Sequence, residues 1–181
     1  MCSSSNSATD MNKNSKFLKT INCTLLCLKY PFLKHEYQKD KFFQNTCWYF
    51  AVNHGWRYIF LQMCEEIKRS LKRDGMPLTS FRIYDINEDD GVMEIDCSGG
   101  FDEDVTKIVE KYEYISFRTC IKCGRQAYGY ASKWVAPYCK ECGSGIEMKP
   151  FYTEEDDWYG YTRWNNTKTP TNDDVTIVRT S

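Results

Sequence analysis

The sequence predicts an α+β fold, in which a helix, a β-hairpin and a second helix form the core and a zinc ribbon or knuckle is appended to it. Three observations support this fold class. Residues 55–73 have an apolar pattern of helical period, residues 79–97 have two apolar runs around an acidic turn, and two C-x2-C pairs follow residue 119. The chain has 181 residues, of which 41% are hydrophobic, enough for one core and a small module.

The first predicted helix covers residues 55–73. Gly55 precedes it, and Asp74–Gly75 ends it. Basic residues gather towards its C-terminus, where the helix dipole favours positive charge. Its apolar positions recur every three or four residues: Trp56, Ile59, Phe60, Met63, Cys64, Ile67 and Leu71.

The hairpin is predicted at residues 79–97, with its turn at Asn87–Gly91. The first strand is marked by Phe81, Ile83 and, less regularly, Tyr84 and Ile86, and the second by Val92, Met93 and Ile95. A second helix follows from the acidic residues 102–104 and leads directly into the first cysteine pair. Its apolar stripe is Val105, Ile108, Val109, Tyr112 and Ile115.

The cysteine pairs Cys120/Cys123 and Cys139/Cys142 have 15 residues between them, a spacing typical of a four-thiolate zinc site. A two-residue gap lets both thiolates of one turn reach the same ion. Gly124 and Gly143 follow the pairs, and we expect both to use φ > 0 so that backbone N–H groups face the sulfurs. Four thiolates leave no position for water, so the sequence predicts one structural zinc ion. A pair of redox dithiols lacks the βαβ context that such motifs need, whereas an iron–sulfur cluster stays an alternative.

Five further cysteines, at positions 23, 27, 47, 64 and 97, raise the question of a second metal site. The chain offers only His35 and His54 as additional nitrogen ligands, and the cysteine spacing is irregular. We therefore expect these cysteines to be buried free thiols.

Composition divides the chain into four parts: a disordered N-terminus (1–16), an α+β core domain (17–118), the zinc module (119–149) and an acidic, aromatic, flexible tail (150–181). No apolar run reaches the ~20 residues of a membrane span, and no signal peptide is evident. Many cysteines without a secretory signal favour a reducing compartment, so we expect a cytoplasmic protein with no membrane association.

A further pattern joins features along most of the chain: Trp48–Phe50, Gly55–Trp56, Cys64, the hairpin at 81–97, Glu113, Ser116 and Cys120–Gly124. The order of these features resembles a family of small uncharacterised proteins of phages and prophages. The resemblance covers residues 29–145 and departs from the family where His54 replaces an expected Asp and where a glycine-containing strand is reduced to Phe81–Tyr84. It implies a zinc-bound α+β protein of phage or prophage type, in a bacterial or phage-infected cell, and no particular reaction.

No catalytic motif such as G-x-S-x-G or H-E-x-x-H is present, so we expect a non-enzymatic accessory protein that binds a macromolecule. The net charge of −1 and the acidic tail favour a protein partner, with modulation of a host or defence system as one role. The alternative is a nucleic acid, because residues 118–149 carry six basic residues against two acidic ones and aromatic residues able to stack on bases. The expected contact residues are Arg118, Lys122, Arg125, Tyr128, Lys133 and Trp134.

Overall fold

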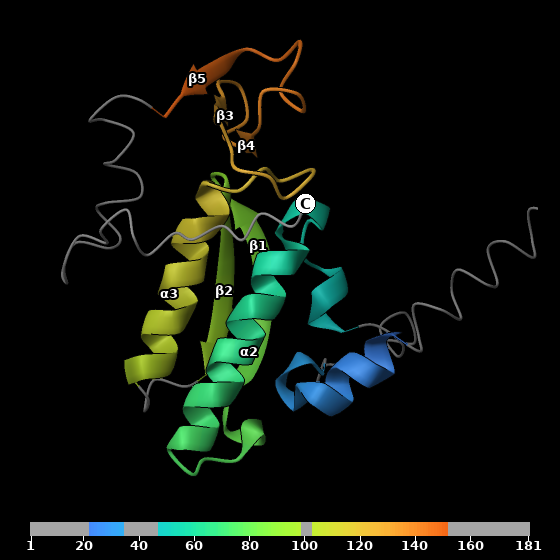
Figure 1. Ribbon diagram of the computed structural model, residues 1–181, viewed down its shortest axis with the longest axis vertical. Coiled ribbons are helices and arrows are strands. Elements are labelled where there is room, and N and C mark those ends of the chain that lie inside the picture. The colour runs from blue at the N-terminus through green and yellow to red at the C-terminus, as the bar shows by residue number, and fades with distance from the viewer. Residues whose placement is uncertain (1–21, 35–46, 99–102, 152–181) are drawn as a thin grey trace, which may run out of the picture.

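The computed structural model describes residues 22–34, 47–98 and 103–151. It contains helices and two antiparallel sheets, which confirms the α+β class (Figure 1). The predicted N-terminal part at 1–16 and all of the predicted tail beyond residue 151 lie outside the described residues. Among the described helices, none is both long enough and apolar enough to cross a membrane.

Helix α2 (Arg57–Arg73) follows a short 3-10 turn, η3 (His54–Trp56), so the regular α-helix begins two residues later than the sequence indicates. Lys72 and Arg73 occupy its last turn, as the helix dipole favours. Its apolar stripe is buried in the core, including Phe60, Met63 and Ile67 with no measurable exposure.

Strands β1 (Arg82–Asp89) and β2 (Val92–Ser98) form an antiparallel hairpin. The turn is tighter than predicted, because it consists of Asp90 and Gly91, both with positive φ. The register shifts between Ile83 and Asp85, as in a β-bulge, and Tyr84 is 47% exposed there. The bulge explains the irregular apolar alternation of the first strand, since an extra residue changes the face to which later side chains point.

Helix α3 (Glu103–Phe117) packs against both α2 and β2 (Figure 1). Two of its polar side chains accept hydrogen bonds from the strand: Met93 N donates to Ser116 Oγ at 2.8 Å, and Ile95 N donates to Glu113 Oε1 at 2.9 Å. An exposed strand edge is a template for unwanted pairing, so these contacts protect the outer edge of β2.

One hydrophobic core joins the helices, the buried face of the hairpin and the N-terminal segment. That segment is helical at residues 22–29 and continues into η1 (Pro31–Leu33), which contributes Phe32 and Leu33 to the core. Two more 3-10 turns, η2 (Trp48–Phe50) and η4 (Leu78–Ser80), complete this side of the molecule. The ring of Phe32 meets that of Phe81 edge-on, with their centroids 5.2 Å apart.

The C-terminal module contains a three-stranded antiparallel sheet in the order β4–β3–β5. Its strands are β3 (Gly129–Ala131), β4 (Pro137–Tyr138) and β5 (Met148–Pro150). Phe151 packs edge-on against Phe117, with ring centroids 5.0 Å apart, so the ordered packing extends past residue 149. In Figure 1 the module lies at one end of the hairpin and the two helices.

Candidate metal centre

Each cysteine pair lies on a tight turn that directs both of its thiols towards the other pair. Gly124 N donates to Cys120 O and Gly143 N donates to Cys139 O, both at 2.9 Å. Gly124 has φ +76, as expected, whereas Gly143 is not among the glycines with positive φ; Gly145 is, with φ +81. The glycine with positive φ therefore comes two residues later after the second cysteine pair than after the first.

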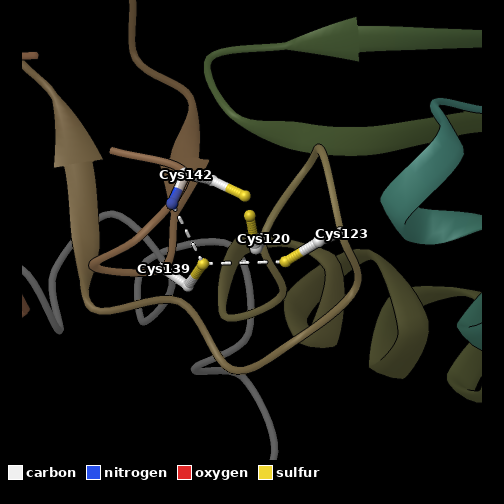
Figure 2. A group of neighbouring side chains, drawn as sticks. All are labelled: Cys120, Cys123, Cys139 and Cys142. Carbon is white, nitrogen blue, oxygen red and sulfur yellow. Dashed lines mark hydrogen bonds between the residues drawn. The ribbon is translucent and has the colours of Figure 1, made fainter. Parts of the chain in front are cut away.

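The four sulfur atoms converge on one point (Figure 2). All lie within 4.8 Å of one another, and Cys123 Sγ and Cys139 Sγ are 3.6 Å apart. Four sulfurs bound at about 2.3 Å to one tetrahedral ion are separated by about 3.8 Å. A disulfide requires about 2.05 Å, and all four cysteines are free thiols. The arrangement is compatible with a metal site.

Nearby donors stabilise negative charge on the sulfurs. Cys142 N lies 3.4 Å from Cys139 Sγ, and Arg125 Nε lies 3.5 Å from Cys123 Sγ. Burial of Cys123 opposes ionisation, but the side-chain and backbone hydrogen bonds from Arg125 outweigh it and lower the pKa of this thiol to about 6. Hydrogen bonding with Cys123 raises the pKa of Cys142 to about 12.

The first cysteine turn is joined to the start of α2 by backbone contacts. Gly55 N donates to Ile121 O at 2.9 Å, and the Trp56 indole N–H donates to Thr119 O at 2.9 Å. His54 Nδ1 lies 3.2 Å from Lys122 O. Because Gly55 and Trp56 are both buried, the first cysteine turn is packed directly against the core.

A second junction joins the module to the tip of the hairpin. Gly91 lies so close to the module that a Cβ there would be 3.0 Å from Val135 O. The Trp134 indole N–H donates to Glu88 Oε2 at 3.1 Å. On the other side, Tyr130 and Phe151 stack around Phe117 at the end of α3.

The basic residues expected at a partner surface are mostly engaged within the module. The guanidinium of Arg118 lies 4.4 Å from the Phe151 ring centre, and Lys122 Nζ lies 5.3 Å from that of Tyr138. Arg125 forms a 2.5 Å ion pair with Glu141. Tyr128 is partly buried, with Lys140 Nζ 4.8 Å from its ring centre.

Lys133 and Trp134 both lie exposed on the loop after β3. Trp134 exposes 71% of its surface, the second highest value among the large hydrophobic residues that the structure describes as exposed. Lys122 and Arg125 are exposed as well, so their contacts within the module leave them at the surface. The expected partner surface therefore stays a prediction.

Sequence reasoning placed the four cysteines correctly but missed the residues that support them. Gly55 and Trp56 were assigned to the start of a helix and to the family resemblance, although they also contact the cysteine turn. Glu141 is one of the two acidic residues counted against the basic ones, and it pairs with Arg125 and lies 3.5 Å from Cys139 Sγ. A glycine–tryptophan pair before an amphipathic helix is the one local signal that points to a close backbone contact.

Comparison with known proteins gives no match to a family model, to a curated protein or to a solved structure. The resemblance to a phage and prophage family therefore stays a prediction, and the functional argument rests on this chain's own residues.

Proposed function

We propose that Cys120, Cys123, Cys139 and Cys142 hold one zinc ion as a structural centre, and that the C-terminal module is a zinc ribbon joined to the helix–hairpin–helix core. The convergence of four free thiols within 4.8 Å carries this proposal. Zinc suits a tetrahedral set of four thiolates, and that set leaves no open position for a substrate. The proposal therefore assigns the ion to stability rather than to catalysis.

The position of the centre supports a structural role. Within residues 119–151, every strand has three residues or fewer, so the module has little regular structure of its own. An ion bound to both cysteine turns would fix the turn that contacts Gly55 relative to the turn that precedes β5. In small zinc domains, metal binding and folding are the same event.

Zinc content measured by elemental analysis tests this assignment. We compare the reduced full-length chain with Cys123→Ser/Cys142→Ser, which leaves only two thiols at the centre, and with Cys97→Ser, whose cysteine lies outside the four-cysteine group. Cys123 is exposed and Cys142 is partly exposed, so serine disturbs little packing there. We expect Cys123→Ser/Cys142→Ser to contain one zinc ion fewer per chain than the wild type and Cys97→Ser to match it. Equal zinc in all three proteins contradicts the proposal.

For the whole protein, we propose a non-enzymatic accessory protein of phage or prophage type that binds another protein in a reducing cytoplasm. Nine free cysteines among the described residues fit a reducing compartment. The surface around Trp134 supports a protein partner. This exposed aromatic side chain lies beside Lys133 and is bonded to Glu88, next to the exposed Asp89 and Asp90.

Mixed charge around an exposed aromatic residue is typical of a protein interface. The carboxylates of the hairpin turn would repel a phosphate backbone approaching the same loop. Because Arg125 already forms an ion pair with Glu141, part of the module's positive charge is compensated locally.

A photocrosslinking amino acid at position 134 tests the surface, with one at the exposed Tyr58 of α2 as the matched control. In cells that contain the natural partner, we expect a discrete protein adduct from position 134 and none from position 58. A nucleic-acid adduct would favour the alternative function. In that case, binding to an oligonucleotide should weaken steeply with salt and fail in Arg125→Gln/Lys133→Gln.

A further inference from the structure

A second group of thiols lies in the N-terminal half, away from the four-cysteine centre. Cys23 and Cys27 are four residues apart in the helical segment at 22–29, so they share one helix face. Cys47 precedes η2 and pairs with Lys34 in an isolated antiparallel bridge. The sulfur atoms of Cys23, Cys27 and Cys47 all lie within 4.8 Å of one another.

We propose that Cys23, Cys27 and Cys47 form a second metal site, a three-thiolate site for a soft ion such as zinc. Three sulfurs bound at about 2.3 Å to one ion are separated by about 3.8–4.0 Å, within the limit observed here. The three cysteines are free thiols rather than disulfide partners. Soft sulfur ligands select zinc, copper(I) or iron over magnesium and calcium.

The packing of the helical segment gives a physical reason for a bound ion. A helix of eight residues is marginal by itself, and its stability must come from the face that it buries. Here that face presents Cys23 and Cys27 with the partly buried Leu26, whereas Leu25 and Leu28 are 58% and 74% exposed. Thiols bury little apolar area, so an ion that joins this face to Cys47 would supply stability that packing does not.

The end of this segment also contacts α2 through polar groups. Tyr30 Oη donates to Glu65 Oε2 at 2.7 Å, and Lys29 Nζ lies 3.2 Å from the same oxygen. The Lys29–Glu65 pair is exposed, and such pairs contribute little to stability. The bridge between Lys34 and Cys47 brings the third thiol to this segment.

The donor set also defines the chemistry of the site. Three thiolates around a divalent ion leave a net charge of −1, and Lys34 contributes a favourable Coulombic interaction at Cys27. A tetrahedral ion would keep one coordination position for water or another ligand, unlike the four-cysteine centre. Cys23 and Cys47 are 7% and 1% exposed, whereas Cys27 is partly exposed and marks the side open to solvent.

Packing of hydrophobic thiols is the competing explanation, and the chain contains an example of it. Cys64 of α2 is fully buried among core residues and belongs to neither group of thiols. A thiol that only fills space needs no other thiol near it. Residues from two separate segments bring three sulfurs together at Cys23, Cys27 and Cys47, which packing alone does not require.

The test counts metal ions bound to the full-length chain, purified under reducing conditions, by elemental analysis and by mass spectrometry under non-denaturing conditions. Zinc is supplied during expression, and the elemental analysis also quantifies copper and iron. The variants are Cys27→Ser, which is only partly buried, and Cys47→Ser. Cys97→Ser is the matched control, because Cys97 lies in neither group.

We expect two ions in the wild type and in Cys97→Ser, and one ion in each of Cys27→Ser and Cys47→Ser. A single ion in the wild type that persists in both variants but disappears in Cys123→Ser/Cys142→Ser overturns the second site and leaves the first intact. Two ions in Cys123→Ser/Cys142→Ser would instead contradict the four-cysteine centre. The same two ions in Cys27→Ser and Cys47→Ser as in the wild type would also overturn the second site.

Discussion

The backbone of Gly55 lies directly against the carbonyl oxygen of Cys120, so closely that a Cβ at position 55 would lie 2.1 Å from it. The start of α2 and the first cysteine turn thus meet without any intervening side chain. Gly55 is required for this close approach rather than for an unusual φ, because it is not among the glycines with positive φ.

Gly55→Ala should destabilise the protein by about 3 kcal/mol, because the added methyl group forces the cysteine turn away from α2. Gly75→Ala is the control: Gly75 has φ +69 but no atom within 4 Å of an added Cβ, so we expect only about 1 kcal/mol from backbone strain. Urea unfolding of both variants measures the difference. Equal losses of stability in the two variants would show that Gly55 and Cys120 are not in close contact in solution.

Trp56→Phe should also weaken the junction, by about 2 kcal/mol. Phenylalanine cannot donate to Thr119 O, and it leaves that buried acceptor unpaired next to a small void. Trp134→Phe is the matched control, because Trp134 is largely exposed and its bond to Glu88 lies at the surface. Thermal unfolding should show a lower Tm for Trp56→Phe and little change for Trp134→Phe.

Ser116→Ala tests the protection of the free edge of β2. The fully buried Ser116 accepts from Met93 N and donates to Glu113 O. Alanine leaves the Met93 amide without this acceptor, at a cost of about 2 kcal/mol. Hydrogen exchange should become faster at Met93, while the control Ser80→Ala, which removes an exposed hydrogen bond to Pro77 O, leaves it unchanged. Unchanged exchange at Met93 in Ser116→Ala would mean that another group accepts the hydrogen bond from Met93 N.

Thiol alkylation tests the electrostatics of the metal-free centre. The pKa of Cys123 lies below its ordinary value of 9.0, at about 6. The stability that this thiolate contributes to the metal-free fold is therefore complete above pH 9 and is lost as the pH falls through 6. In the metal-free protein at pH 7, iodoacetamide should modify Cys123 first, as seen by peptide mass spectrometry.

Arg125→Gln removes the side-chain donor and should move the midpoint of the Cys123 alkylation rate to higher pH. Lys133→Gln serves as the charge-matched control, since Lys133 is exposed and no bond to a thiol involves it among those described. Zinc added before the reagent should protect Cys123 in the wild type. A wild-type midpoint near pH 9 would show that Arg125 does not lower the pKa of Cys123.

The α+β class, the position of α2 and the identity of the four cysteines could all be predicted from the sequence. Helical periodicity and the C-x2-C spacing are local properties, so they do not depend on how distant segments pack. The strand pattern was less reliable at Tyr84, because a bulge is set by pairing with the opposite strand.

Contacts between distant segments were decided only by the tertiary structure. No spacing rule connects Gly55 with Cys120, Ser116 with Met93, or Cys47 with Cys23, since each pair is separated by more than 20 residues. The sequence itself determined which residues are able to bind a metal or enter a core. The packing of α2, α3 and the hairpin decided which of them meet, because close packing depends on shapes assembled from the whole chain.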